Sequence, residues 1–201
     1  TLDITIAGIA LLLSMPLFIT IALAIRLTSP GPAIFRQERV GYRGRRFEFL
    51  KFRSMRVGSS PDIHQAYTDH WIHGRSGAGD GARGELHKLE SDPRITPVGR
   101  FLRKTSLDEL PQLINVLQGH MSLVGPRPPL PYEVERYTEW HKRRLEVPPG
   151  LTGLWQISGR NNISFDQMVA LDLAYIEQWS LLRDIEILLK TVPALVASRG
   201  H

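Results

Sequence analysis

The sequence lacks cysteine altogether in its 201 residues. A disulfide framework, a thiolate zinc site, an iron–sulfur cluster and a cysteine nucleophile are therefore excluded. It also lacks both common glycine-rich phosphate loops, G-x-x-x-x-G-K-[ST] and G-x-G-x-x-G after a strand, and it has no internal repeat. Hydrophobic residues make up 42% and charged residues 22% of the chain, which excludes intrinsic disorder and collagen. The length suits one compact domain with an appendage.

Acidic residues are the minority among the charged ones. The chain has 25 lysines and arginines against 20 aspartates and glutamates, a net charge of +5. This excess favours an anionic partner such as nucleic acid, a lipid headgroup or a phosphorylated substrate. Between Arg26 and Arg56 nine basic residues stand against two glutamates, a local net charge of +7, so the remaining chain carries about −2. A solvated basic hairpin is the alternative interpretation of this segment, but the adjacent apolar segment makes proximity to a membrane the better explanation.

Charge is missing completely from residues 4–25, which read ITIAGIALLLSMPLFITIALAI. As a continuous helix with a rise of about 1.5 Å per residue, this segment would be about 33 Å long, enough to cross a bilayer. The basic residues follow the segment rather than precede it, which disfavours a signal peptide. A basic excess directly after a membrane segment favours a cytoplasmic location for the following chain and attracts anionic lipid headgroups.

Pro16 lies near the middle of this apolar segment, two residues after Ser14. Proline removes a helix hydrogen bond and clashes with the preceding turn, so we expect a bend there. Two interpretations remain open: a kinked helix that crosses the membrane, and a re-entrant helix that returns to the face it entered.

The chain after the apolar segment begins with a predicted hairpin and a polar insertion. Residues 33–40 and 46–55 resemble two strands joined across GYRG, with Phe47 and Phe49 on one face. Residues 57–90 are polar and glycine-rich, and we expect a loop insertion. Neither the spacing of its histidines and aspartates nor a strand–helix frame favours a metal site over a solvated loop. These residues are Asp62, His64, Asp69, His70 and His73.

The second half of the chain is predicted to be mostly helical. Residues 101–117 form a helix with a break, and three amphipathic stretches follow. In residues 134–145, Tyr137 and Trp140 lie beside basic residues, which suits a membrane interface and a protein core equally. The apolar faces of the other two stretches consist of Phe165, Val169, Leu173 and Ile176, and of Leu181, Ile185, Leu188, Leu189 and Val192.

The residues best suited to carry out chemistry lie in the segment RKTSLDELPQLIN, where two cations precede two adjacent carboxylates. Ser106 and Glu109 match the capping box S-x-x-E, which is the structural interpretation of both. Pro111 fits better if the helix begins nearer Asp108. The positive end of the helix and the cations would then lower the pKa of Asp108, and an ionised carboxylate is an available nucleophile. Downstream, Arg127 between two prolines suits a pre-organised site for phosphate or a planar base.

Several motifs occur in a fixed order: the apolar helix broken at proline, LTSPGPAIFRQERVG, FEFLKFRSM, GRFLRKTSLDELPQLINVLQGHMSLVGPRP, PGLTGLWQISGRN and WSLLRDIEILLKTV. Together they resemble the bacterial sugar transferases, monotopic phosphoglycosyl transferases that move a sugar 1-phosphate from a nucleotide sugar to a polyprenyl phosphate. The resemblance covers nearly the whole chain apart from residues 57–90. It implies an α+β, mostly helical fold with a small β-hairpin and amphipathic interfacial helices. Residues 1–27 would form a re-entrant membrane helix and residues 28–201 a cytoplasmic, membrane-associated catalytic domain.

The resemblance also implies which residues act. Asp108 and Glu109 match the family's Asp-Glu pair, with Asp108 as the nucleophile and as a ligand of Mg²⁺. By motif match, Arg103 would hold the phosphate of the lipid acceptor and Arg127 would contact the uridine end of the donor. The role of Glu109, a base or a structural residue, stays open. Further candidates for phosphate contacts are Lys51 and Arg53.

The reaction expected from this resemblance has two steps. Attack of Asp108 on the phosphorus that bears the sugar would release UMP, and the phosphate of undecaprenyl phosphate would then take the phosphosugar from the aspartate. The donor would be a UDP-sugar, with glucose or galactose favoured, in the first membrane step of exopolysaccharide or O-antigen synthesis.

The expected location is the cytoplasmic face of the bacterial inner membrane. There the enzyme would have inner-membrane lipids as partners and Mg²⁺ as cofactor, and a homodimer is possible. Two other classes fit the sequence less well. A basic module for nucleic acid or lipid leaves the carboxylates beside the cations unexplained, and we expect no nucleic-acid partner. An inactive polysaccharide-assembly scaffold would not need those residues intact.

Overall fold

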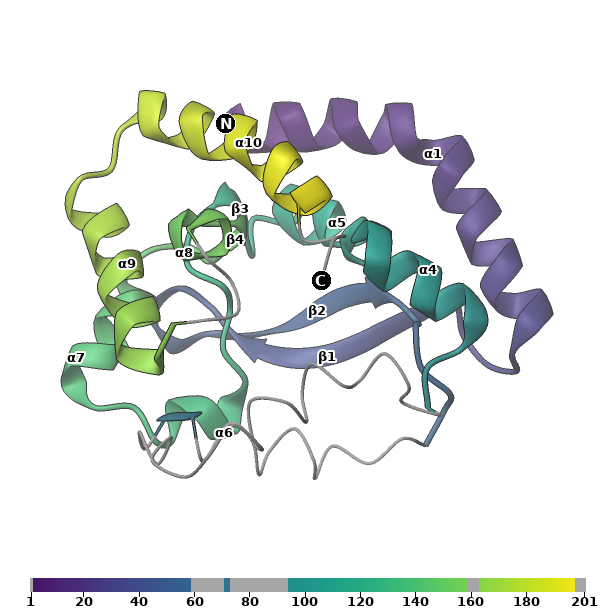
Figure 1. Cartoon of the computed structure of the whole chain (residues 1–201), viewed down its shortest axis with the longest axis horizontal. Coiled ribbons are helices and arrows are strands. Elements are labelled where there is room, and N and C mark those ends of the chain that lie inside the picture. Colours follow the sequence, from purple (N-terminus) through teal and green to yellow (C-terminus); the bar gives the residue numbers. More distant parts are fainter. Residues whose placement is uncertain (1, 59–70, 73–93, 159–162, 198–201) are drawn as a thin grey trace.

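The computed structural model describes residues 2–58, 71–72, 94–158 and 163–197. Within them the predicted α+β, mostly helical fold is confirmed (Figure 1). The predicted insertion at residues 57–90, with its histidines, lies almost wholly outside the described residues. The elements are α1 (Leu2–Thr28), β1 (Ile34–Val40), η1 (Tyr42–Gly44), β2 (Arg46–Phe52), α4 (Pro97–Thr105), η3 (Leu107–Glu109), α5 (Gln112–Leu117), β3 (Ser122–Val124), α6 (Pro131–Val134), α7 (Glu139–Lys142), η4 (Arg143–Glu146), β4 (Gly150–Thr152), α8 (Leu154–Ile157), α9 (Phe165–Glu177) and α10 (Leu181–Ala197).

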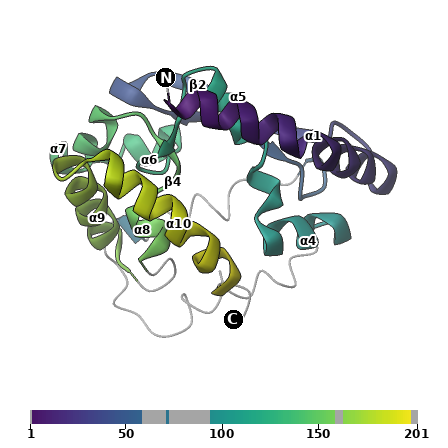
Figure 2. The same cartoon turned by 90° about the horizontal axis from the view of Figure 1, so that it is seen from above.

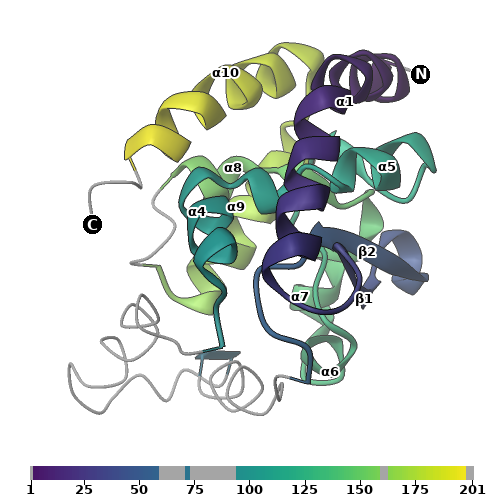
Figure 3. The same ribbon diagram turned by 90° about the vertical axis from the view of Figure 1, so that its right-hand side faces the viewer.

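Helix α1 bends near its middle, as Figures 1 and 3 show. Pro16 lies inside the helix, and the Ser14 hydroxyl donates a hydrogen bond to the Leu11 carbonyl at 3.2 Å. The missing proline amide weakens the backbone ladder at this point, which explains the bend. The predicted bend is therefore confirmed, whereas the side of a membrane on which each end of α1 lies stays a prediction.

One stripe of α1 packs against the rest of the chain and the remainder is exposed. Ala7, Ile21 and Ile25 are buried, with Leu11 and Phe18 partly buried on the same stripe. An exposed apolar surface of this extent fits lipid rather than water. Among the described residues, α1 is the one helix long and apolar enough to cross a membrane, with a mean hydropathy of 2.4. Its exposed apolar residues are Leu2, Ile4, Ile6, Ile9, Leu12, Leu13, Met15, Leu17, Ile19, Leu23 and Leu27.

The predicted hairpin is confirmed and is slightly shorter than expected at its second strand. Strands β1 and β2 pair antiparallel with Gln37 opposite Phe49. The outer edge of β2 is occupied by one side chain of α5: the Asn115 amide donates to the Glu48 carbonyl at 2.7 Å and accepts from the Leu50 amide at 3.0 Å. Asn115 is completely buried, so this contact fixes α5 to the hairpin.

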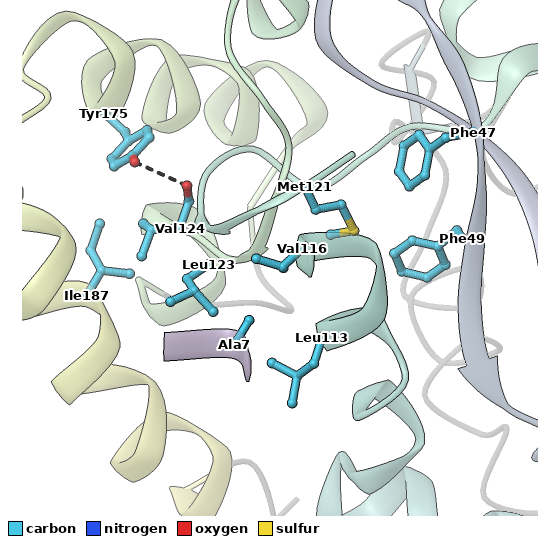
Figure 4. Packing of buried hydrophobic residues seen from close by; sticks show 10 residues of the cluster. All are labelled: Ala7, Phe47, Phe49, Leu113, Val116, Met121, Leu123, Val124, Tyr175 and Ile187. Atoms are coloured by element: carbon cyan, nitrogen blue, oxygen red, sulfur yellow. Dashed lines mark hydrogen bonds between the residues drawn. The ribbon is translucent and has the colours of Figure 1, made fainter. Parts of the chain in front are cut away.

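The main core joins α1, β2, α5, β3, α9 and α10 (Figure 4). Strands β3 and β4 form a short parallel pair in it. The Tyr175 hydroxyl donates to the Val124 carbonyl at 3.3 Å and so ties α9 to β3 (Figure 4). The buried members of this core are Ala7, Phe47, Phe49, Leu113, Val116, Met121, Leu123, Val124, Tyr175 and Ile187.

The predicted amphipathic stretch at residues 134–145 is not one helix but is divided among α6, α7 and η4. Tyr137 is buried, with its ring 5.6 Å from that of Phe165, so the core interpretation holds for this residue, whereas Trp140 is exposed. The predicted apolar face of α9 is confirmed as a buried face, because Phe165 and Val169 are both inside.

Helix α10 presents much of its apolar face to the outside. Ile187 points into the core, whereas Leu181, Ile185 and Leu189 are exposed. The first half of α1 and α10 lie on the same side of the molecule (Figures 1 and 2).

Candidate functional site

The chain that carries the two predicted carboxylates makes a turn between α4 and α5. Ser106 ends α4 in the left-handed conformation, with φ of 56°, and its side chain caps no helix. A short 3₁₀ turn follows, and α5 begins at Gln112, directly after Pro111. The capping box predicted for Ser106 and Glu109 is therefore wrong, because the serine belongs to the end of one helix rather than to the start of the next.

Asp108 is buried in this turn, with 8% of its surface exposed. Burial raises the pKa of its carboxyl and Glu109 adds to the rise, while Lys51, Arg103 and Arg127 act to lower it. The lowered pKa expected from the sequence is thus wrong for the protein without ligands, because loss of solvation outweighs the nearby positive charges. Asp108 forms no hydrogen bond or ion pair within the described residues, so its oxygens are available to a ligand.

Glu109 joins two of the predicted cations. Its Oε1 accepts from Lys51 Nζ at 3.5 Å and from an Arg127 terminal nitrogen at 3.4 Å. All three side chains are partly buried, and burial lowers the pKa of Lys51 while Glu109 opposes that shift. The structure therefore brings β2, η3 and the segment after β3 together around one carboxylate.

Arg103 approaches the same site from α4. Its Nε donates to the Ser54 hydroxyl at 2.9 Å, and its charge acts on the pKa of Asp108. Gly99 permits this close packing, because a Cβ there would lie 2.0 Å from the Ser54 carbonyl oxygen. Arg103 as a whole is an exposed residue.

Arg53 does not join the site. Its guanidinium donates to the Pro30 carbonyl at 2.8 Å, and to the Ser29 carbonyl and hydroxyl at 2.8 and 2.7 Å. The side chain is buried, and these bonds tie the end of α1 to the chain after β2. Arg53 therefore has an anchoring position rather than the predicted phosphate contact.

A buried arginine on β1 was missed at the level of sequence. Arg39 donates to the Pro128 carbonyl at 3.0 Å and to the Gln37 side chain at 2.9 Å. Burial, with a contribution from Arg127, lowers the pKa of Arg39 to about 10. The two-residue period of a strand places Arg39 on the same face as the inward-facing Phe47, which is the signal that could have found it.

The donor set fits a divalent cation that is shared with a substrate. Among the described residues no group of three or more histidines, aspartates and glutamates could enclose a metal. Mg²⁺ needs no such cage, since it usually binds through one or two carboxylates together with substrate phosphates. Asp108, buried and without a hydrogen bond within the described residues, suits that role.

Comparisons with known proteins agree on one family. The sequence pattern of the bacterial sugar transferases matches residues 1–198. The galactosyl transferase CpsE of Streptococcus agalactiae is 52% identical over 99% of this chain and 42% of its own length. The exopolysaccharide production protein ExoY of Rhizobium meliloti is 42% identical over 98% of this chain and 85% of its length.

A third relative is named for its substrates. The UDP-glucose:undecaprenyl-phosphate glucose-1-phosphate transferase of Caulobacter vibrioides is 42% identical over 98% of this chain and 69% of its own length. The chain thus spans less than half of CpsE and most of the other two relatives.

Proposed function

Because the chain belongs to the bacterial sugar transferase family, we propose that it transfers a hexose 1-phosphate from a UDP-sugar to undecaprenyl phosphate and releases UMP. The observation that carries the proposal is the buried Asp108, which has no hydrogen bond within the described residues and lies in the field of Lys51, Arg103 and Arg127. The names of the relatives favour galactose or glucose as the sugar and exopolysaccharide synthesis as the pathway.

In the proposed first step, an oxygen of Asp108 attacks the phosphorus that bears the sugar. The bond between that phosphorus and the oxygen bridging to UMP breaks, and UMP leaves with the electron pair. The hexose phosphate is then bonded to the Asp108 carboxylate as an acyl phosphate. In the second step a phosphate oxygen of the lipid attacks the same phosphorus, and the carboxylate of Asp108 is regenerated.

The surrounding side chains have distinct roles in this proposal. Asp108 would hold Mg²⁺ together with the diphosphate, and the bound ion would supply neutralisation of the phosphate charge. Arg103 would hold the phosphate of the lipid and Arg127 the uridine end of the donor. Glu109 would act as the shared counter-ion that keeps Lys51 and Arg127 beside Asp108, since it contacts both cations.

The membrane arrangement that we propose is a re-entrant α1 in the cytoplasmic leaflet of the bacterial inner membrane. Both ends of α1 are bonded to the same catalytic domain: Asp3 accepts from the Ser122 hydroxyl at 2.8 Å, and Ser29 accepts from Arg53. A domain on one side of a bilayer could not hold both ends of a spanning helix. The exposed apolar residues of α1 and α10 supply the surface that enters the lipid.

The covalent step is tested with the full chain in detergent, Mg²⁺ and UDP-glucose or UDP-galactose, without lipid. We expect UMP release in a burst no larger than the enzyme concentration, and a mass gain of one hexose phosphate on the peptide with Asp108. Asp108→Asn should lose both, because an amide has no anionic oxygen to attack phosphorus. Asp166→Asn, at an exposed carboxylate, is the matched control and should keep both. A burst without an adduct on Asp108 would refute the mechanism.

A further inference from the structure

The backbone that carries Arg127 is held almost entirely through its carbonyl groups. Three of the four residues from 126 to 129 are prolines, which have no backbone N–H to donate. Each of the four carbonyls accepts a hydrogen bond from a different residue elsewhere in the chain. These bonds are Gly150 N to Pro126 at 2.8 Å, Arg144 to Arg127 at 3.4 Å, Arg39 to Pro128 at 3.0 Å and Val40 N to Pro129 at 2.9 Å.

Two of these four donors are buried arginine side chains, Arg39 and Arg144. Burying a guanidinium is costly unless its donors are satisfied. Arg144 donates to Asp172 at 2.7 Å and to the Tyr137 hydroxyl at 2.9 Å, and Arg39 donates to the Gln37 side chain at 2.9 Å. Each arginine is therefore oriented by its own partners while a remaining nitrogen bonds the segment.

Both arginines donate hydrogen bonds to this backbone. Arg144 donates to the carbonyl of Arg127 itself, and Arg39 donates to the carbonyl of Pro128. Within the described residues neither one bonds to Asp108 or Glu109. A guanidinium can meet a ligand in a fixed geometry only if its own backbone is fixed.

We propose that Arg39 and Arg144 are positioning residues: they hold the backbone of Arg127 and thereby set the affinity of the site for a uridine diphosphate group. The inference rests on the proposed function, in which Arg127 contacts the uridine end of the donor. Asp172, on α9, contributes to this positioning because its carboxylate accepts a hydrogen bond from Arg144 and so orients the guanidinium.

The experiment compares Arg144→Lys with Arg143→Lys in the full chain. Lysine keeps the charge, but its single ammonium cannot reproduce the fork of donors that reaches both Asp172 and the Arg127 carbonyl. Arg143 is the adjacent residue. It is exposed and pairs with Glu177, which lies on α9 as Asp172 does, so Arg143 is a matched control. With UDP and Mg²⁺ as the probe in calorimetric titration, Arg144→Lys should bind about tenfold more weakly. Arg143→Lys should stay within about twofold of wild type.

The same comparison applies on β1, where Arg39→Lys should weaken UDP binding and Arg36→Lys, at an exposed pair, should not. A loss of stability alone is separated by Ile21→Ala, which removes buried volume on α1 in a cluster that holds no partner of Arg39 or Arg144 and should leave UDP affinity unchanged. In the Arg127→Ala background, Arg144→Lys should add no further loss, because the side chain that it positions is gone.

The outcomes separate the inference from the proposed function. If Arg127→Ala weakens UDP binding while Arg144→Lys and Arg39→Lys bind as wild type does, the positioning role is overturned and the function stands. Additive losses in the double variant would also overturn it, because they would mean that Arg144 acts independently of Arg127. If the wild-type chain binds no UDP, the proposed function falls and the inference falls with it.

Discussion

Replacing Asn115 with leucine tests whether one buried amide fixes α5, and with it the turn that carries Asp108 and Glu109, to the hairpin. The amide bonds both the Glu48 carbonyl and the Leu50 amide on the outer edge of β2. Leucine has a similar volume but offers neither a donor nor an acceptor. The substitution therefore removes two hydrogen bonds without leaving a large cavity.

The expected loss follows from the two backbone groups that remain. Each backbone group left without a partner costs about 1–3 kcal/mol, so the free energy of unfolding should fall by about 2–6 kcal/mol. For a chain of this size the melting midpoint should fall by about 4–24 °C. Because β2 carries Lys51 and the turn before α5 carries Asp108 and Glu109, a shift of α5 should also lower turnover about tenfold below the melting range.

The assay is thermal unfolding in detergent, followed by UMP release at a temperature at which both proteins are folded. Gln118→Leu, at the exposed end of the same helix, is the control and should change the free energy of unfolding by less than about 0.5 kcal/mol. A midpoint for Asn115→Leu within the error of wild type would show that the α5 contact with β2 does not depend on this amide.

Three other predictions concern the membrane helix and the cations. Single cysteines placed at positions 2 and 28, in a chain that has no other cysteine, should both be labelled only from the cytoplasmic side, and label on opposite sides would mean a spanning helix. Arg127→Ala should raise the KM for the UDP-sugar more than that for the lipid, and Arg103→Ala should do the reverse; equal effects in the two titrations would contradict the assignment. Glu109→Gln should lower turnover by at least about tenfold and should also lower the melting midpoint, because it leaves the largely buried Lys51 and Arg127 without their shared carboxylate; turnover at the wild-type rate would contradict this role.

The sequence by itself determined the features that depend on local patterns. The uncharged run with Pro16 predicts a long bent helix, and α1 is such a helix. Alternation around Phe47 and Phe49 predicts the hairpin, and a helical spacing predicts the inward face of α9. These predictions succeed because they depend on residues that are close together in the sequence. A proline changes the hydrogen bonds of its own helix turn, and the two-residue period of a strand or the 3.6-residue period of a helix repeats within a few residues.

Only the tertiary structure decided what the candidate site residues touch. Glu109 matches a capping box locally, yet its carboxylate pairs with Lys51, 58 residues away. Arg53 lies two residues after Lys51 but donates to Ser29 at the end of α1. Asn115 accepts from the amide of Leu50 at the edge of β2, although the two residues are 65 positions apart in the sequence. Asp108 has a raised pKa because burial outweighs the cations that its sequence neighbourhood supplies. Partners and solvation come from distant segments brought together by packing, and no local spacing specifies which segments those are.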